Sequence, residues 1–202
     1  CPRPSKLAGI LAKLDHPYPQ AHQDLVEVYQ FEAQELAHML LQTIRLKRTT
    51  TKELTSLLSE HPDYPIYASL PGTGDYLQAA LLSKLGDDRQ RFGSANHLQA
   101  LAGTCPVTVS SGKRKFVRFR HACDRDFRRI AQQWAKSSLG SSVWANTYYS
   151  QVLPRCDSHS HAYRCLANRW LAILWRLWQD RLPYNESYHL QQRRMKSRPV
   201  YH

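Results

Sequence analysis

The stretch best suited to chemistry is TCPVTVSSGKRKFVRFR, residues 104–120, in which Ser110, Ser111 and Gly112 directly precede a dense run of cations. A serine hydroxyl becomes a nucleophile when its proton is removed and the charge developing on its target is neutralised. Guanidinium groups can neutralise the oxygens of a phosphate under attack. The pattern therefore allows attack by serine on a phosphodiester. No Ser-His-Asp grouping lies nearby, and the residues alone favour a polar turn, since serine and glycine are common there.

Cations interleaved with phenylalanines follow the two serines. The cationic residues between positions 113 and 129 are Lys113, Arg114, Lys115, Arg118, Arg120, Arg125, Arg128 and Arg129. The whole chain has 28 Lys and Arg against 16 Asp and Glu, a formal net charge of +12. Such an excess is typical of proteins that bind polyanions, and arginine can hold two phosphate oxygens at once. We expect this segment to contact phosphates, with a solvated basic face as the alternative.

A second candidate phosphate contact is the turn Leu70-Pro71-Gly72-Thr73-Gly74, which precedes a predicted helix. It has the form of the turn in a helix-hairpin-helix module. Gly72 and Gly74 would let the backbone approach a phosphate, and the N–H groups of the next helix would face it. Such a contact positions a protein on nucleic acid without reading bases. A plain turn between helices is the alternative.

Four metal-ligating residue types lie within ten positions: Cys156, His159, His161 and Cys165. Structural zinc sites usually join two separated pairs of ligands, and this cluster lacks a second pair. A helix start at Ser158 or Ser160 is the preferred interpretation. The sequence therefore predicts no metal site in this chain.

The elements that must position these residues are mostly helices, so we predict a mainly α fold. Residues 22–47 contain no Gly or Pro and repeat apolar residues at helical spacing, which predicts a long amphipathic helix. Thr50 and Glu53 fit a capping box before a shorter helix that ends at Pro62. The two helices would form a helical hairpin or one arm of a coiled coil.

Shorter elements follow. We predict helices near residues 75–85 and from Ser94 to Ala102, and a short basic hairpin or extended loop over 107–120. Within residues 162–178, the stretch 170–178 is apolar on nearly all sides, which predicts a buried central helix. We expect order to end at Pro183. The predicted organisation is an irregular leader (1–21), a helical or coiled-coil connector (22–65), a helical bundle with the glycine turn and basic hairpin (66–190), and a flexible basic tail (191–202).

The five cysteines are an odd number without a compact spacing, so no disulfide framework is expected. No secretory signal or apolar run of membrane-spanning length appears, which indicates a cytoplasmic protein without a membrane partner. The chain begins with Cys1 rather than Met, and we interpret it as a fragment of a longer protein.

Several short motifs, in order and at characteristic spacing over about residues 68–188, resemble the C-terminal transposase domain of the IS110 insertion-sequence family (IS116/IS902 type). The motifs are Pro71-Gly72-Thr73-Gly74, Gly86-Asp87 with Arg91-Phe92, Ala102-Gly103-Thr104-Cys105-Pro106, and Ser111-Gly112. The later stretches RHACDRDFRRIAQQWAKSS, WANTYYSQVL and LANRWLAILWRLWQDRLPY resemble the same domain. Residues 22–60 resemble the coiled-coil connector that precedes it in the family. Thr73 departs from the family pattern, in which an aliphatic residue is usual.

The resemblance implies a mobile-element recombinase that cuts and joins DNA and is directed by a guide RNA. It implies that Ser111, the serine before the glycine, is the nucleophile, with Ser110 as the neighbour a one-residue misalignment would choose. Gly72, Gly74 and the basic residues would then seat nucleic acid. It further implies a homo-oligomer and an N-terminal RuvC-like domain whose acidic residues bind divalent metal such as Mg²⁺. No segment of this chain matches that domain, so we expect no cofactor here and an inactive isolated fragment.

Two hypotheses follow. The preferred one is the serine-bearing half of a DNA transposase. The alternative is a non-catalytic nucleic-acid-binding module, whose binding would weaken steeply with ionic strength.

Overall fold

The computed structural model describes residues 8–9, 11–13, 22–111 and 114–196 and divides into two units, residues 1–49 and 50–202. The division falls inside helix α2 (Gln23–Ser59). After α2, the described residues form a set of packed helices with one two-stranded sheet. The predicted mainly α fold is confirmed. No helix in the described part of the chain is long and apolar enough to cross a bilayer.

Helix α2 is continuous where the sequence predicted two helices. Thr50 and Glu53 lie inside it and not at a helix start, so the capping-box interpretation and the helical hairpin are both wrong. The Thr49 hydroxyl donates a hydrogen bond of 3.2 Å to the carbonyl of Arg45, one turn earlier. Because threonine can satisfy its hydroxyl inside a helix in this way, the threonine-rich stretch continues the helix.

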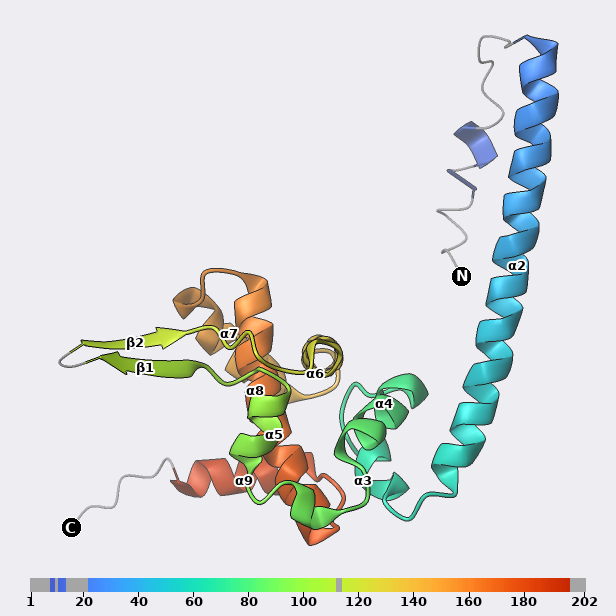
Figure 1. The fold of residues 1–202 in the computed structure, drawn as a ribbon. Helices are drawn as coiled ribbons and strands as arrows, with labels where there is room; N and C mark the ends of the chain where they lie inside the picture. The colour runs from blue at the N-terminus through green and yellow to red at the C-terminus, as the bar shows by residue number, and fades with distance from the viewer. Residues whose placement is uncertain (1–7, 10, 14–21, 112–113, 197–202) are drawn as a thin grey trace, which may run out of the picture. The chain divides into compact units, whose positions relative to one another are not determined.

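Helix α8 (His159–Asp180) is the central element of the second unit and packs against α5, α6 and α7 (Figure 1). The other helices are α3 (Tyr64–Ala68), α4 (Asp75–Leu85), α5 (Ala95–Leu101), α6 (Arg125–Ser138), α7 (Val143–Val152) and α9 (Glu186–Lys196), with 3₁₀ turns η1 (Arg89–Arg91) and η2 (Leu153–Arg155). The prediction of a buried central helix is confirmed, because Trp170, Leu174 and Trp178 of α8 are fully buried.

Tryptophans form the centre of the core. The ring of Trp170 lies 5.2 Å from that of Trp134 on α6 and 4.8 Å, edge to face, from that of Trp144 on α7. Its indole N–H donates a 2.9 Å hydrogen bond to the hydroxyl of Ser138. One side chain of α8 therefore joins two neighbouring helices.

The glycine turn between α3 and α4 is pressed against the C-terminal end of α6. Gly72 has a φ of +73°, and a Cβ atom there would lie 2.5 Å from the backbone of Ser137 and Ser138. The indole of Trp134 donates to the carbonyl of Pro71 at 3.0 Å. Gly74, by contrast, is the exposed N-cap of α4, with open space around it. Packing against α6 is thus sufficient to explain Gly72.

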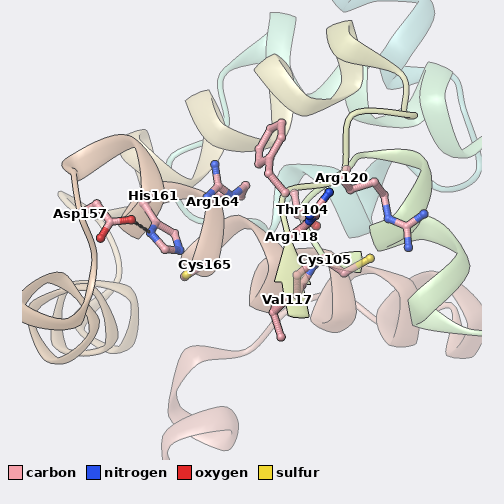
Figure 2. A pocket seen from close by; sticks show the side chains of 12 residues that line it. Thr104, Cys105, Val117, Arg118, Arg120, Asp157, His161, Arg164 and Cys165 are labelled. Carbon is pink, nitrogen blue, oxygen red and sulfur yellow. Dashed lines mark ion pairs between the residues drawn. The ribbon is translucent and has the colours of Figure 1, made fainter. Parts of the chain in front are cut away.

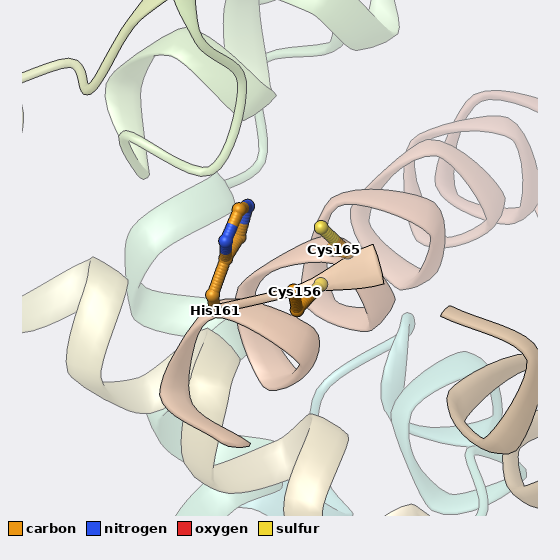
Figure 3. Close-up of side chains that lie close together, drawn as sticks. All are labelled: Cys156, His161 and Cys165. Carbon is orange, nitrogen blue, oxygen red and sulfur yellow. The ribbon is translucent and has the colours of Figure 1, made fainter. Parts of the chain in front are cut away.

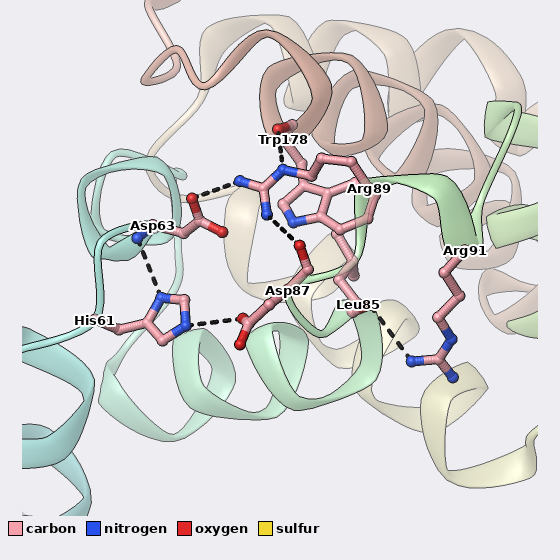
Figure 4. A network of polar contacts seen from close by, with 7 residues as sticks. All are labelled: His61, Asp63, Leu85, Asp87, Arg89, Arg91 and Trp178. Atoms are coloured by element: carbon pink, nitrogen blue, oxygen red, sulfur yellow. Dashed lines mark hydrogen bonds and ion pairs between the residues drawn. The ribbon is translucent and has the colours of Figure 1, made fainter.

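A polar network joins the end of α2 to the loop after α4 and to α8 (Figure 4). Arg89 donates to the carboxylate of Asp63 at 2.5 Å and to the carbonyl of Trp178 at 3.0 Å, and its guanidinium lies 4.6 Å from the Trp178 ring centre. His61 pairs with Asp87 at 2.9 Å. The Gly86-Asp87…Arg91-Phe92 motif therefore lies in a stretch that fixes three parts of the bundle together.

The chain continues as a helix beyond Pro183. Helix α9 (Glu186–Lys196) follows, so the prediction that order ends at Pro183 is wrong, and the helix includes residues 191–196 of the predicted tail. Residues 197–202 lie outside the described part of the chain. Asn185 caps the start of α9, because its side-chain oxygen accepts from the backbone N–H of Tyr188 at 2.9 Å. The carboxylate of Glu186 accepts hydrogen bonds from the Ser142 hydroxyl, the Trp144 backbone N–H and the Tyr184 hydroxyl, and so joins α9 to the start of α7.

We expect Glu186→Gln to lower the free energy of unfolding by about 1–3 kcal/mol, the range for hydrogen bonds to a charged group. Three donors converge on this carboxylate, and an amide offers only one accepting oxygen. Urea denaturation followed by circular dichroism measures the change. Glu60→Gln, in the exposed turn after α2, is the control and should leave the midpoint unchanged. Equal midpoints for the two variants would contradict the role of Glu186.

Candidate nucleic-acid interface

The basic segment forms the predicted short hairpin. Strand β1 (Val107–Ser111) pairs with β2 (Arg114–Arg118) in antiparallel register, with Ser111 opposite Arg114 and Ser110 opposite Lys115. Gly112 and Lys113 of the connecting loop lie outside the described residues. Figure 1 shows the hairpin extending away from the helices.

The register separates the two serines. Successive positions of a strand face opposite sides, so position 111 shares a face with positions 114, 116 and 118, and position 110 shares the other with 115 and 117. Ser111 is thus placed at the loop end of the strand, on the face that carries two of the arginine positions.

Strand β2 is solvated from its middle to the hairpin base although it carries apolar residues. Phe116 is 48% and Val117 68% exposed, and Arg118 is exposed beside them. An exposed pair of strands bearing cations and an aromatic ring has the composition of a surface that contacts backbone phosphates and sugars or bases. These side chains are not part of the buried core of the second unit, so contact with a binding partner is a better explanation of their exposed apolar surface.

Two arginines hold the base of the hairpin. The guanidinium groups of Arg128 and Arg164 lie 4.3 Å and 4.6 Å from the ring centre of Phe119. Arg128 also donates to the carbonyl of Arg120 and to the sulfur of Cys123. Arg128, predicted as a phosphate contact, is therefore engaged in holding the loop that leads from β2 to α6. Sequence reasoning did not single out Arg164, which directly precedes Cys165 in the cluster of metal-ligating residue types.

A cavity of about 370 Å³ lies between the hairpin base and the start of α8 (Figure 2). Its basic lining residues are Arg118, Arg120 and Arg164, and its other polar residues include Thr104, Asp157 and His161. Arg120 is half-buried and its Nε atom has no hydrogen-bond partner among the described residues. The cavity is therefore a place where an anionic group would meet guanidinium donors.

The two predicted phosphate contacts lie at opposite ends of α6. The hairpin leads into the helix start, where Arg125 is exposed in the first turn, and Gly72 lies against Ser137 at the other end. Twelve residues separate Arg125 from Ser137, which is about 18 Å along a helix. Arg125 thus lies near the hairpin, and Gly72 and Gly74 do not.

The start of α6 is fixed by a charged N-cap. The carboxylate of Asp124 accepts from the backbone N–H of Phe127 at 2.9 Å and from the ammonium of Lys84 at 2.8 Å. The Lys84 ammonium, followed by the Phe127 N–H, holds the pKa of Asp124 below its usual range. Asp124, in turn, raises the pKa of Lys84.

This pair predicts a pH dependence of stability. The pKa of Asp124 is lower in the folded state, so its contribution is present above the unfolded pKa of about 3.9 and is lost as pH falls through the folded value. We expect Asp124→Asn, which keeps an N-cap acceptor but removes the ion pair with Lys84, to cost about 0.5–1 kcal/mol at pH 7 and to flatten the acid limb of a plot of unfolding midpoint against pH. Glu60→Gln should leave that limb as in the wild type. A limb unchanged by Asp124→Asn would contradict the assignment.

The helix start preferred at Ser158 is confirmed, and it brings metal-ligating side chains together. The Ser158 hydroxyl accepts from the backbone N–H of His161 at 3.2 Å. Cys156, His161 and Cys165 place their ligating atoms within 4.8 Å of one another. Burial, and then the neighbouring Cys156 thiol, raise the pKa of Cys165. His159 is held elsewhere, sharing a 2.6 Å hydrogen bond with the Tyr149 hydroxyl.

Comparison with known proteins gives consistent matches. Residues 65–150 match the model of the transposase IS116/IS110/IS902 family. The chain is 34% identical over 156 residues to the mini-circle protein of IS117 from Streptomyces coelicolor, covering 74% of this chain and 38% of that protein. It is 30% identical over 148 residues to the 43.6 kDa protein of insertion element IS110 from the same organism, covering 72% and 36%. It is also 31% identical over 126 residues to the 42 kDa protein of IS900 from Mycobacterium paratuberculosis, covering 62% and 32%.

The chain spans just over a third of the length of the first two of these relatives. The family match covers the glycine turn, Asp87 and Arg89 of the polar network, the hairpin, α6 and most of α7. The order of motifs in the sequence, the mainly helical fold and these matches agree, and the chain belongs to the IS116/IS110/IS902 transposase family.

Proposed function

We propose that this chain is the serine-bearing part of a DNA transposase and that Ser111 is its nucleophile. The observation that carries the proposal is the hairpin, which holds Ser111 opposite Arg114 at the end of an exposed, basic strand pair. Ser110, on the other face, has no such arginine opposite it. The proposed place of action is DNA in the bacterial cytoplasm, at the nucleoid.

In the proposed reaction the Ser111 oxygen forms a bond to phosphorus, the bond from phosphorus to a deoxyribose oxygen breaks, and that oxygen leaves with a proton. The product is a phosphoserine link between protein and one DNA end. Joining is the reverse attack by a deoxyribose hydroxyl on this ester, which frees the serine. The negative charge on the attacked phosphate grows during each step, so nearby guanidinium groups lower the barrier.

The basic residues have different proposed roles. Lys113, Arg114, Lys115 and Arg118 on the hairpin would bind the DNA backbone beside the attacked phosphate, and Arg120 and Arg125 would extend this surface toward α6. Arg128 would act indirectly, through its hold on Phe119 and the carbonyl of Arg120. For the glycine turn, the helix-hairpin-helix proposal rests on the exposed Gly74, because α6 already fills the space beside Gly72.

The family resemblance implies a divalent metal such as Mg²⁺, and the described carboxylates do not fit one. Among the described residues, the group with carboxylates placed closely enough is His61, Asp63 and Asp87. Asp63 is already paired with Arg89, and Asp87 with His61. We propose that the metal is held by an acidic domain outside these residues, and no step above depends on it.

We also propose two partners besides DNA: a guide RNA and further copies of the protein. Helix α2 supports self-association, since Leu25, Tyr29, Leu36 and Met39 recur at spacings of three, four and seven residues and are all more than half exposed. A coiled coil between copies would bury this stripe. The guide RNA rests on the net positive charge and the family resemblance.

The test of Ser111 is covalent trapping in cells that carry an intact element and the full transposase to which this chain belongs. Denaturing extraction should recover DNA linked to wild-type protein and to the matched control Ser110→Ala, and none linked to Ser111→Ala. Links that persist in Ser111→Ala would remove this serine from the proposed role. DNA binding without links in any variant, the wild type included, would favour the non-catalytic binding module.

The basic surface is tested by salt dependence. We expect Arg114→Ala, Lys115→Ala and Arg118→Ala together to reduce the slope of log affinity against log salt by about 2.7, because each lost phosphate contact accounts for about 0.9. Fluorescence anisotropy with a 30-base-pair duplex measures it. The charge-matched control replaces Lys136, Arg155 and Arg176 with alanine. Equal slopes for the two triple variants would mean that the hairpin does not bind the backbone.

A further inference from the structure

Two thiol groups and one imidazole lie close together at the start of α8 (Figure 3). None of them takes part in the proposed transposition chemistry. His161 and Cys165 are four residues apart on one helix and therefore share a face. Cys156 follows the 3₁₀ turn η2, and the N-cap at Ser158 turns the chain so that this thiol returns to the same face. The three ligating atoms lie within 4.8 Å of one another, and all three residues are half-buried.

We propose that Cys156, His161 and Cys165 bind one zinc ion. Two thiolates and an imidazole are the ligands that zinc prefers. With bonds of about 2.3 Å to sulfur and 2.0 Å to nitrogen, tetrahedral ligands lie about 3.5–3.8 Å apart. Closing from 4.8 Å to this range takes only small rotations of the side chains. Zinc with two thiolates carries no net charge, so the site adds nothing to the positive charge of Arg164 next to it.

Residues around the cluster would orient the ring of His161 and would leave the fourth coordination position of the zinc ion open. The carboxylate of Asp157 lies 3.5 Å from Nδ1 of His161, which leaves Nε2 for the metal. Metal-bound histidines commonly pair their other ring nitrogen with a carboxylate in this manner. His161 and Cys165 also line the cavity beside Arg118 and Arg164 (Figure 2). A water molecule on the fourth position of zinc would therefore face that cavity.

Zinc at this site would tie the end of α7 and η2 to α8 and so fix one wall of the cavity at the hairpin base. The sequence argument against zinc was the lack of a second pair of ligands. The structure meets this argument in part, because the chain turns between Cys156 and α8 and brings three ligands together from one segment. This inference does not depend on the proposed transposition chemistry.

The test is zinc binding by the 202-residue chain itself, without DNA. Protein purified under reducing conditions, so that Cys156 and Cys165 stay as thiols, is stripped with chelator and titrated with Zn²⁺ or Co²⁺. We expect one metal per chain, a cobalt spectrum with thiolate charge-transfer absorption and intense tetrahedral bands, and a higher unfolding temperature with Zn²⁺. Cys156→Ser, Cys165→Ser and His161→Ala should each weaken binding by at least about 100-fold, and Asp157→Ala by about 10-fold.

Matched controls are His159→Ala and Cys123→Ser, which leave the three ligands intact and should bind as the wild type does. Circular dichroism shows whether each variant folds; if a cysteine variant does not, the wild-type stoichiometry and His161→Ala decide. Less than about one fifth of a zinc ion per reduced wild-type chain would overturn the proposal. A cobalt spectrum unchanged in His161→Ala and Cys165→Ser would overturn it equally. Neither result bears on Ser111, whose test uses DNA links.

Discussion

Replacing Gly72 with alanine is expected to lower the free energy of unfolding of the second unit by about 3 kcal/mol or more. Two costs combine. A non-glycine residue held at positive φ costs about 1–3 kcal/mol, and φ at Gly72 is +73°. The added methyl group would also lie 2.5 Å from the backbone of Ser137 and Ser138, and overpacking of this kind typically costs about 1–3 kcal/mol.

The backbone of α6 cannot move aside cheaply, because Trp134 on the same helix is fully buried and bonded to Pro71. Urea denaturation followed by circular dichroism measures the loss. Gly93→Ala is the matched control, since Gly93 has neither a positive φ nor an atom within 4 Å of an added Cβ. It should change stability by less than about 0.5 kcal/mol. A similar effect at both glycines would mean that the turn is not pressed on α6.

A further variant, Gly74→Ala, separates the two explanations of the glycine turn. If the turn serves only to pack against α6, Gly74→Ala will leave DNA affinity unchanged at temperatures where the protein is folded. If its backbone seats a phosphate, Gly74→Ala will weaken binding, because the methyl group is added in open space beside the N-terminus of α4. The carboxylate of Asp75 in the first turn of α4 favours the packing explanation, since it already places a negative charge there.

Features that depend on neighbouring residues were predictable from the sequence. The apolar stretch of 170–178 predicted the central helix α8, and the segment 107–120 was predicted to form a short hairpin or an extended loop. Ser94 and Gly103 marked the ends of α5, where Gly103 has a φ of +62°. Such local patterns fix the type of an element because side-chain period and turn geometry act over a few residues.

Features that depend on distant residues were not predictable. Glu186 caps α7 from more than forty residues away in the sequence, and Arg89 donates to the carbonyl of Trp178, 89 residues further along the chain. No pattern within one window of sequence contains both partners. The prediction of two helices in place of α2 failed for a local reason. A threonine-rich stretch can either start a new helix or continue the existing one, and here a threonine hydroxyl bonds to a carbonyl of the previous turn and the helix continues.

The candidate site divides in the same way. The family resemblance singled out Ser111 and the density of cations singled out the basic positions, and the strand register places Ser111 and Ser110 on opposite faces of the hairpin. The sequence could not show that the guanidinium of Arg128 packs over the ring of Phe119 and donates to the carbonyl of Arg120. Charge and residue type identify a basic surface, but which cations remain available to a phosphate depends on packing.

Replacing Trp170 with alanine is expected to cost about 3–5 kcal/mol, the range for removing a buried tryptophan. The side chain is fully buried, contacts the rings of Trp134 and Trp144, and donates to Ser138. A domain of this size is usually stable by only about 5–15 kcal/mol, so the variant should unfold at much lower urea, as measured by circular dichroism. Trp170→Phe, which keeps an aromatic ring, should lose less than half as much stability, and Tyr188→Ala on the exposed side of α9 should lose almost none.

Loss of Trp170 should also reduce DNA binding at 37 °C, because α8 packs against α5, α6 and α7 and the bundle supports the base of the hairpin. Binding that persists at a temperature where the helices have melted would show that the hairpin binds DNA without the bundle.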